Sequence, residues 1–114
     1  MKNNMITLIT GATSGIGKST ALEFAKHGYN LIITGRRQER LAELKTDLEK
    51  EYKINVLELC FDVRDEKQVA AAFNSIPSEF KGIDVLVNNA GLAAGLSTIQ
   101  DGNLNHWEQM IDTN

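Results

Sequence analysis

The sequence alternates short apolar runs with longer segments whose apolar residues recur at helical spacing, and this alternation constrains the fold more than any other feature. Strands are expected at residues 5–10, 31–34, 54–61 and 83–87, with helices between them. Strands that alternate with helices form parallel sheets with right-handed crossovers. The pattern therefore predicts an α/β fold with a doubly wound, Rossmann-like parallel sheet, in which ligands bind at the carboxyl ends of the strands.

The segments between the strands carry apolar stripes that we expect to face the sheet. Asp65 is expected to be the N-cap of the third helix, and Pro77 to follow its end. Cys60, on the third strand, is expected to be buried as a small apolar residue. After the fourth strand the pattern reaches only a loop, at residues 92–103, and the start of one more helix. The expected stripes are Ile16, Thr20 and Phe24, then Leu41, Leu44 and Leu48, then Val69, Phe73 and Ile76, and finally Leu104, Trp107 and Ile111.

Composition limits the partners that this chain can have. Its 114 residues, 42% hydrophobic and 24% charged, suit a single domain over residues 1–114. The net charge of −3 comes without a basic block, which argues against a nucleic acid or an anionic membrane as partner. One cysteine excludes an internal disulfide, and neither a signal peptide nor a membrane-spanning run is evident, so we expect a cytoplasmic protein. His27 and His106 have no partner spacing for a metal, and no metal site is expected.

A glycine-rich segment, residues 10–19 (TGATSGIGKS), joins the first expected strand to the first expected helix. At such a point backbone N–H groups and the helix dipole attract phosphate, and glycine lets the backbone approach it closely. One interpretation is a P-loop, in which Lys18 would reach the outer phosphates, Ser19 would hold Mg²⁺ and Asp62 could be a second metal ligand. The other is a dinucleotide-binding turn that uses the glycines in the spacing T-G-x-x-x-G-x-G.

Residues farther along the chain favour the dinucleotide turn. A dinucleotide site needs a group for the adenosine ribose about 20 residues on, at the end of the second strand. Gly35, Arg36 and Arg37 stand there. A P-loop protein has no specific need for adjacent arginines at this point. The alternative interpretation of the two arginines is a solvated, charged helix start.

Taken together, the motifs resemble those of the short-chain dehydrogenase/reductase family. They follow one another in the family's order over nearly the whole chain. A narrower resemblance, to the NADP-dependent 3-hydroxy acid dehydrogenases of that family, rests on residues 35–41, 88–93 and 107–114. The family motifs are residues 10–17 (TGATSGIG), 62–63 (DV), 88–91 (NNAG) and 112–114 (DTN).

The resemblance implies a role for each matching residue. Arg36 and Arg37 would hold the 2′-phosphate of NADP, and Asp62 would accept a hydrogen bond from the adenine amino group, with an Asx turn as the alternative for that residue. Asn88 would secure the sheet. Asn114 would be the catalytic asparagine that holds a water of the proton relay. The implied cofactor-binding residues are Gly11, Ala12, Thr13, Ser14, Gly15, Ile16, Arg36, Arg37, Asp62, Val63, Asn89, Ala90 and Gly91.

The resemblance also implies an activity: an NADP-dependent oxidoreductase that transfers hydride between NADP(H) and a small 3-hydroxy acid or carbonyl compound. This chain would supply the cofactor-binding half, because the family's Ser and Tyr-x-x-x-Lys do not occur in it. We expect the 114-residue chain alone to be inactive and, with an apolar fourth strand at its edge, marginally stable or prone to aggregate. A homotetramer is expected of the full-length protein. The alternatives are a 3-oxoacyl-carrier-protein reductase, an NADP-binding module without turnover, and a P-loop NTPase.

Overall fold

The computed structural model describes residues 5–89, and within them it confirms the expected alternation of strands and helices. Element boundaries differ from the expected ones by one or two residues. The expected loop at residues 92–103 and the helix after it lie outside the described residues. The elements are β1 (Ile6–Thr10), α1 (Gly15–Lys26), β2 (Asn30–Gly35), α2 (Gln38–Tyr52), β3 (Val56–Cys60), α3 (Glu66–Asn74), the 3-10 helix η1 (Ser78–Phe80) and β4 (Val85–Asn88).

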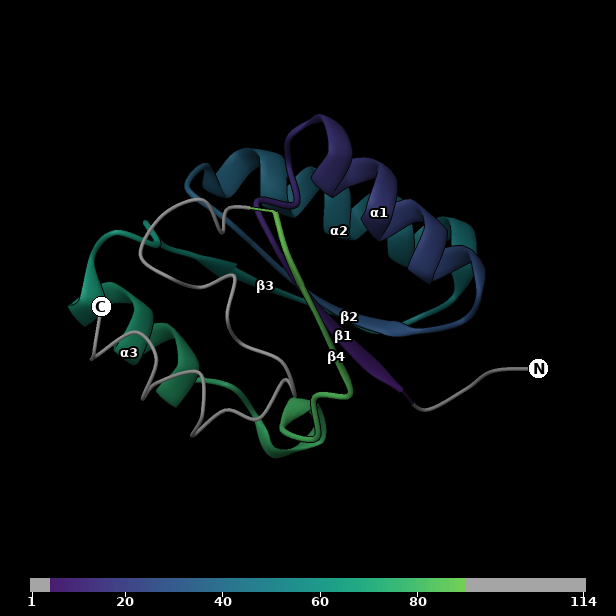
Figure 1. Ribbon diagram of the computed structural model, residues 1–114. Coiled ribbons are helices and arrows are strands. Elements are labelled where there is room, and N and C mark those ends of the chain that lie inside the picture. Colours follow the sequence, from purple (N-terminus) through teal and green to yellow (C-terminus); the bar gives the residue numbers. More distant parts are fainter. Residues whose placement is uncertain (1–4, 90–114) are drawn as a thin grey trace.

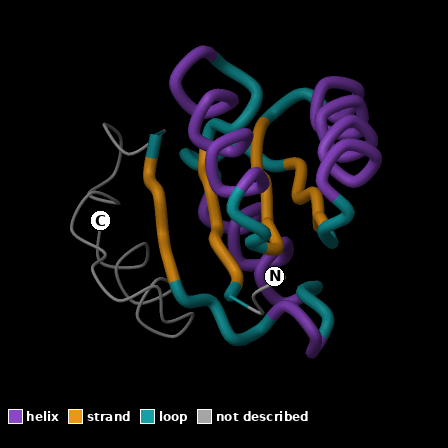
Figure 2. The backbone as a smooth tube through the Cα atoms, turned by 90° about the vertical axis from the view of Figure 1, so that its right-hand side faces the viewer, coloured by secondary structure: helices purple, strands orange, loops and turns teal. Residues whose placement is uncertain are grey.

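The four strands form one parallel sheet in the order β3-β2-β1-β4, and they lie side by side in Figure 2. β1 lies between β2 and β4: Leu8 pairs with Ile32 on one side and with Leu86 on the other. This order matches the first four strands of the doubly wound nucleotide-binding fold, whose full order is 3-2-1-4-5-6. Because every strand runs in the same direction, all four carboxyl ends meet at one rim of the sheet.

Helices cover both faces of this sheet. α1 and α2 lie on one face and α3 on the other (Figure 1). Successive residues of β1 serve the two cores, since Leu8 belongs to the cluster under α3 and Ile9 to the cluster under α1 and α2. Burial on both faces explains why β1 and β2 are largely apolar rather than alternating. No helix among residues 5–89 is both long enough and apolar enough to cross a bilayer.

The buried stripe of α1 differs from the one expected from the sequence. The expected stripe began at Ile16, but that side chain is 77% exposed. The buried residues are Gly17, Ala21 and Ala25, which follow one another at intervals of four and so lie on one side of the helix. Their small side chains let α1 approach the sheet closely, and closeness rather than apolar bulk decides which side faces inward.

The other helices follow the expected pattern more closely. Leu41, Leu44 and Leu48 are buried beneath α2. In α3, Asp65 is the N-cap and accepts hydrogen bonds from the backbone N–H groups of Lys67 and Gln68, as expected. The expectation for Cys60 was wrong, because its side chain is exposed at the carboxyl end of β3, an outer strand of the described sheet.

Candidate functional site

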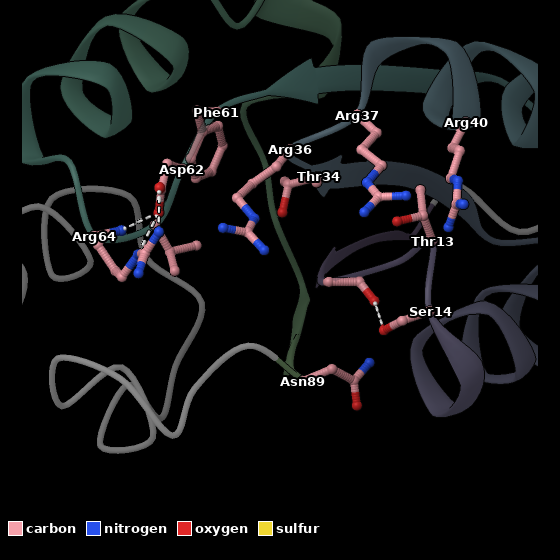
Figure 3. A pocket seen from close by; sticks show the side chains of 13 residues that line it. Thr13, Ser14, Thr34, Arg36, Arg37, Arg40, Phe61, Asp62, Arg64 and Asn89 are labelled. Atoms are coloured by element: carbon pink, nitrogen blue, oxygen red, sulfur yellow. Dashed lines mark hydrogen bonds and ion pairs between the residues drawn. The ribbon is translucent and has the colours of Figure 1, made fainter.

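A cavity of about 470 Å³ opens at the rim where the strands end. Its walls come from the turn after β1, the end of β2 with the start of α2, the segment after β3, and Asn89 after β4 (Figure 3). Each of these four segments contains residues that the family resemblance implied for cofactor binding. The lining residues are Gly11, Thr13, Ser14, Thr34, Gly35, Arg36, Arg37, Arg40, Phe61, Asp62, Val63, Arg64 and Asn89.

Backbone hydrogen bonds join the walls of the cavity to one another. The N–H of Ala12 donates to the carbonyl oxygen of Thr34 over 3.0 Å, which fixes the glycine-rich turn to the end of β2. The N–H of Phe61 donates to the carbonyl oxygen of Gly35 over 2.9 Å, which continues the pairing of β2 and β3 beyond the strands. These backbone hydrogen bonds hold the segments after β1 and β3 against the end of β2, and the side chains that line the cavity project from these segments.

The turn after β1 needs glycine at two positions. Gly11 has a φ of 62°, a left-handed conformation that glycine adopts without strain. A Cβ on Gly17 would lie only 2.0 Å from the carbonyl oxygen of Gly11, so no side chain fits there. The two glycines thus allow the first turn of α1 to close against the turn, which leaves backbone and small side chains facing the cavity.

Every arginine of the chain lines this cavity, and none of the seven lysines among residues 5–89 does. Arg36 and Arg37 follow β2, Arg40 lies in the first turn of α2, and Arg64 follows β3. No ion pair found among residues 5–89 involves Arg36, Arg37 or Arg40. The cavity therefore concentrates positive charge of the planar, permanently ionised kind that suits phosphate groups.

Among the lining residues that the structure describes, Asp62 is the one acid, and its carboxylate is hydrogen-bonded to Arg64. Its Oδ2 accepts a hydrogen bond of 2.9 Å from Arg64 Nη2, and its Oδ1 accepts one of 3.1 Å from Nε. The same Oδ1 accepts the backbone N–H of Arg64 at 2.9 Å, which makes the Asx turn considered from the sequence. These hydrogen bonds, the side-chain ones foremost, lower the pKa of Asp62 from 3.8 to about 2, so its carboxylate is ionised at neutral pH.

Two polar groups at the cavity have no hydrogen-bond partner among residues 5–89. The hydroxyl of Thr34 is one, on a residue only 1% exposed, and the amide nitrogen of Asn89 is the other. A buried polar group without a partner is unfavourable by roughly 1–3 kcal/mol, so a ligand or a water that bonds to it gains that energy. Both residues line the cavity.

Most of the binding residues proposed from the sequence meet at this cavity. Ala12 does not line it, being completely buried, and neither do Gly15 and Ile16, which are exposed at the start of α1. Ala90, Gly91 and Asn114 lie outside the described residues. Asn88 secures the sheet as expected, here through a side-chain hydrogen bond with Thr10. The residues brought together are Gly11, Thr13, Ser14, Arg36, Arg37, Asp62, Val63 and Asn89.

Sequence reasoning missed five lining residues: Thr34, Gly35, Arg40, Phe61 and Arg64. Two of them had a signal. Arg40 follows Arg37 by three residues at a helix start, a spacing that puts both on one side of the chain. Arg64 follows Asp62 by two residues, the spacing of an Asx turn.

The P-loop interpretation accounts poorly for this arrangement. Lys18 and Ser19, its two key residues, are exposed on α1, and neither lines the cavity. The backbone N–H of Lys18 is engaged in the first turn of α1, where it donates to the carbonyl oxygen of Ser14. The positive charge at the rim comes from arginines that a P-loop does not require.

Comparison with known proteins agrees with this geometry. Residues 5–114 match the family model of the short chain dehydrogenases. The chain is 49% identical over 109 residues to sulfoacetaldehyde reductase 2 of Chromohalobacter salexigens, and 46% identical over 110 residues to the NADP-dependent 3-hydroxy acid dehydrogenase YdfG of Escherichia coli K12. Each alignment covers 96% of this chain, but only 42% and 43% of those two proteins.

A solved structure shows the same likeness. L-sorbose reductase from Gluconobacter frateurii, crystallised with NADPH and L-sorbose, aligns with a TM-score of 0.73 and 39% identity. The alignment covers 79% of this chain and 34% of the reductase. Sequence motifs, strand order and cavity thus agree with one another, and the chain belongs to the short-chain dehydrogenase family.

Proposed function

We propose that this chain binds NADP(H) in the rim cavity and forms the cofactor-binding part of an oxidoreductase. Residues 1–114 would then be the N-terminal portion of a single Rossmann-like domain, since the chain spans less than half of the length of the relatives it matches. The observation that carries the proposal is the gathering of all four arginines at the end of the sheet where such folds bind nucleotides.

The residues present fit a dinucleotide with an extra phosphate. The turn after β1 leaves room for a pyrophosphate against Thr13 and Ser14, because Gly17 closes the helix onto Gly11 without a side chain. At the end of β2, where an NAD enzyme commonly carries a carboxylate, Gly35 has none, and Arg36 and Arg37 follow it. Bound NADP(H) would supply the hydride chemistry, and these residues would hold and orient it.

For Asp62 we propose contact with the adenine amino group. Arg64 takes three of the hydrogen bonds that the carboxylate can accept, and a carboxylate has about four acceptor positions, so one further N–H can be accommodated. Val63 would flank the base, and Asn89 would offer its unpartnered amide nitrogen to the ribose on the nicotinamide side. Ala90, Gly91 and Asn114 keep the roles that the family resemblance gives them.

The substrate that we propose is a small 3-hydroxy acid or the corresponding carbonyl compound. Two relatives support this class: one is named for the reduction of sulfoacetaldehyde, a small anionic aldehyde, and the other for 3-hydroxy acids. Hydride would pass between the substrate carbon and the nicotinamide, with a proton transferred to or from the substrate oxygen. A homotetramer is the assembly that we propose for the full-length protein.

Binding titrations test the cofactor. We expect NADPH to bind the protein at least roughly ten-fold more tightly than NADH, because the 2′-phosphate gains charge-assisted hydrogen bonds. The double change of Arg36 and Arg37 to Ala should abolish this preference, and Lys50→Ala, a loss of one exposed cation on α2, should leave it intact. Equal affinity for NADPH and NADH in the unaltered protein, or binding of Mg²⁺-ATP that Lys18→Ala abolishes, would refute the proposal.

The substrate class is tested with the full-length protein. NADP⁺-dependent oxidation of serine and other 3-hydroxy acids is expected, and so is NADPH-dependent reduction of malonic semialdehyde. Turnover of 3-oxoacyl thioesters in place of these acids would favour the acyl-carrier-protein reductase alternative instead.

A further inference from the structure

We propose that Arg40 is a further specificity-determining residue for the 2′-phosphate, which it would hold together with Arg37 and Thr13. This inference rests on the proposed NADP(H) site and extends it. Arg40 lies within residues 35–41, on which the narrower family resemblance rests, but that resemblance assigns it no role. Its place in the structure is what assigns it to the phosphate.

The side chains of Arg37 and Arg40 extend toward the same part of the cavity. Arg37 is the N-cap of α2, and Arg40 is three residues farther on, in the first turn. Residues at this spacing lie on the same side of a helix. In Figure 3 both arginines extend toward Thr13, whereas Arg36 extends between Thr34 and Asp62. The four guanidinium groups are thus divided, and Arg37 and Arg40 flank one spot.

That spot is open because of Gly35. A Cβ built on Gly35 would lie 3.4 Å from the hydroxyl oxygen of Thr13. A side chain at position 35 would therefore begin in contact with Thr13, toward which Arg37 and Arg40 extend. A carboxylate there would add negative charge beside the proposed phosphate, and glycine avoids both effects. Thr13 contributes a hydroxyl that can donate to a phosphate oxygen.

The charges of Arg37 and Arg40 also favour a phosphate between them. Asp62, the one acid that lines the cavity, is engaged by Arg64 through 2.9 Å and 3.1 Å hydrogen bonds. Arg37 and Arg40 have no such partner within the described part of the chain, where the remaining ion pairs join His27 to Glu23 and Lys45 to Glu58. Two guanidinium groups match the charge of a phosphate dianion. One more positive charge in the first turn is also unfavourable for the helix dipole, and a bound anion removes that penalty.

The experiment compares two small ligands that differ only in the phosphate. Calorimetric titrations with 2′,5′-ADP and with 5′-AMP are made on the unaltered protein and on Arg40→Ala, Arg40→Lys and Lys50→Ala. We expect Arg40→Ala to weaken 2′,5′-ADP roughly ten-fold and to leave 5′-AMP unchanged, because one charge-assisted hydrogen bond is lost. Arg40→Lys should recover part of the affinity, since it keeps the charge but not the planar fork. Lys50→Ala, which removes a cation from the other end of α2, should change neither ligand.

The outcomes separate this inference from the function beneath it. Retained affinity for 2′,5′-ADP in Arg40→Ala, or an equal loss for both ligands, overturns the role of Arg40 and leaves the NADP(H) proposal standing. An unaltered protein that does not prefer 2′,5′-ADP over 5′-AMP overturns both. A thermal melt of each variant verifies folding, and the loss of Arg40 should not lower the melting temperature because its charge opposes the dipole of α2.

Discussion

The hydroxyl of Thr10 donates a hydrogen bond of 2.9 Å to the side-chain oxygen of Asn88, which joins the last residue of β1 to the last residue of β4. The two residues are also partners in the strand register. Because the glycine-rich turn begins at the next residue and Asn89 lines the cavity, this hydrogen bond fixes two of the cavity walls relative to each other. The hydrogen bond between Thr10 and Asn88 therefore supports the candidate site, although neither residue lines the cavity.

Replacement of Thr10 by Val should test this hydrogen bond. Valine has nearly the same shape, and Thr10 is completely buried, so the change removes a donor and leaves Asn88 Oδ1 without it. We expect a loss of about 1–3 kcal/mol in the free energy of unfolding, measured by urea denaturation. Thr10→Ser, which keeps the hydroxyl, should recover most of the loss apart from the missing methyl group. A Thr10→Val protein as stable as the unaltered protein would show that packing, and not the hydrogen bond, is what Thr10 contributes.

The contact of Gly17 with the turn makes a second prediction. Gly17→Ala places a Cβ 2.0 Å from the carbonyl oxygen of Gly11, and because that atom is backbone, the turn or the helix must shift. We expect the free energy of unfolding to fall by about 1–3 kcal/mol, as for other overpacked sites. The matched variant is Gly15→Ala, which meets nothing within 4 Å and should gain about 0.5–1 kcal/mol from helix propensity. A Gly17→Ala protein as stable as the Gly15→Ala protein would contradict this packing.

The fold followed from the sequence because strands buried on both faces are apolar along their whole length. The buried side of α1 did not follow, because hydrophobic periodicity gives most weight to large residues. Ile16 is the largest apolar residue at the start of that helix, yet it is exposed, while Gly17 is buried. Gly17 is buried because the turn brings Gly11 into contact with it. Hydrophobic periodicity does not register such a contact.

The site was predictable to the extent that its residues lie in motifs at strand ends. Arg36 and Arg37 could be placed from sequence because they directly follow a strand. Arg40 required knowledge of where α2 begins, which is the least certain feature of a helical pattern. Thr34 was hidden within an apolar strand, where nothing in the sequence distinguishes an unpartnered buried hydroxyl from a satisfied one.

A third prediction concerns the pH dependence conferred by Asp62 and Arg64. The pKa of Asp62 in the folded protein is lowered to about 2, chiefly by the hydrogen bonds from the Arg64 side chain and next by the Arg64 backbone N–H. A lowered carboxyl pKa adds stability that is complete above the unfolded value near 3.8 and is lost as the pH falls toward 2. Arg64→Ala should raise the pKa of Asp62 toward 3.8, as followed by the NMR shift of its carboxyl carbon. The slope of stability between about pH 4 and pH 2 should then decrease, and an unchanged Asp62 titration would contradict the ion pair.

The two helix starts that border the site differ in their caps, and this difference yields the last prediction. At α3, Asp65 Oδ1 accepts the backbone N–H groups of Lys67 and Gln68 over 3.1 and 3.2 Å. Asp65→Ala should therefore lower the free energy of unfolding by about 1 kcal/mol, and Asp65→Asn, which keeps the acceptor oxygen, by less.

At α1, Ser14 occupies the same position, but its side chain makes no capping hydrogen bond and donates instead to the carbonyl oxygen of Gly11 over 3.3 Å. Because the Ser14 side chain does not cap this helix, Ser14→Ala should change stability by no more than about 0.5 kcal/mol. Under the proposed function, a phosphate of NADPH takes the place of the cap that Ser14 does not provide. NADPH should therefore stabilise the protein against urea more than it would a protein whose Ser14 already capped this helix. Denaturation of both Ala variants with and without NADPH measures these effects together, and a Ser14→Ala loss as large as that of Asp65→Ala would show that α1 is capped by its own side chain.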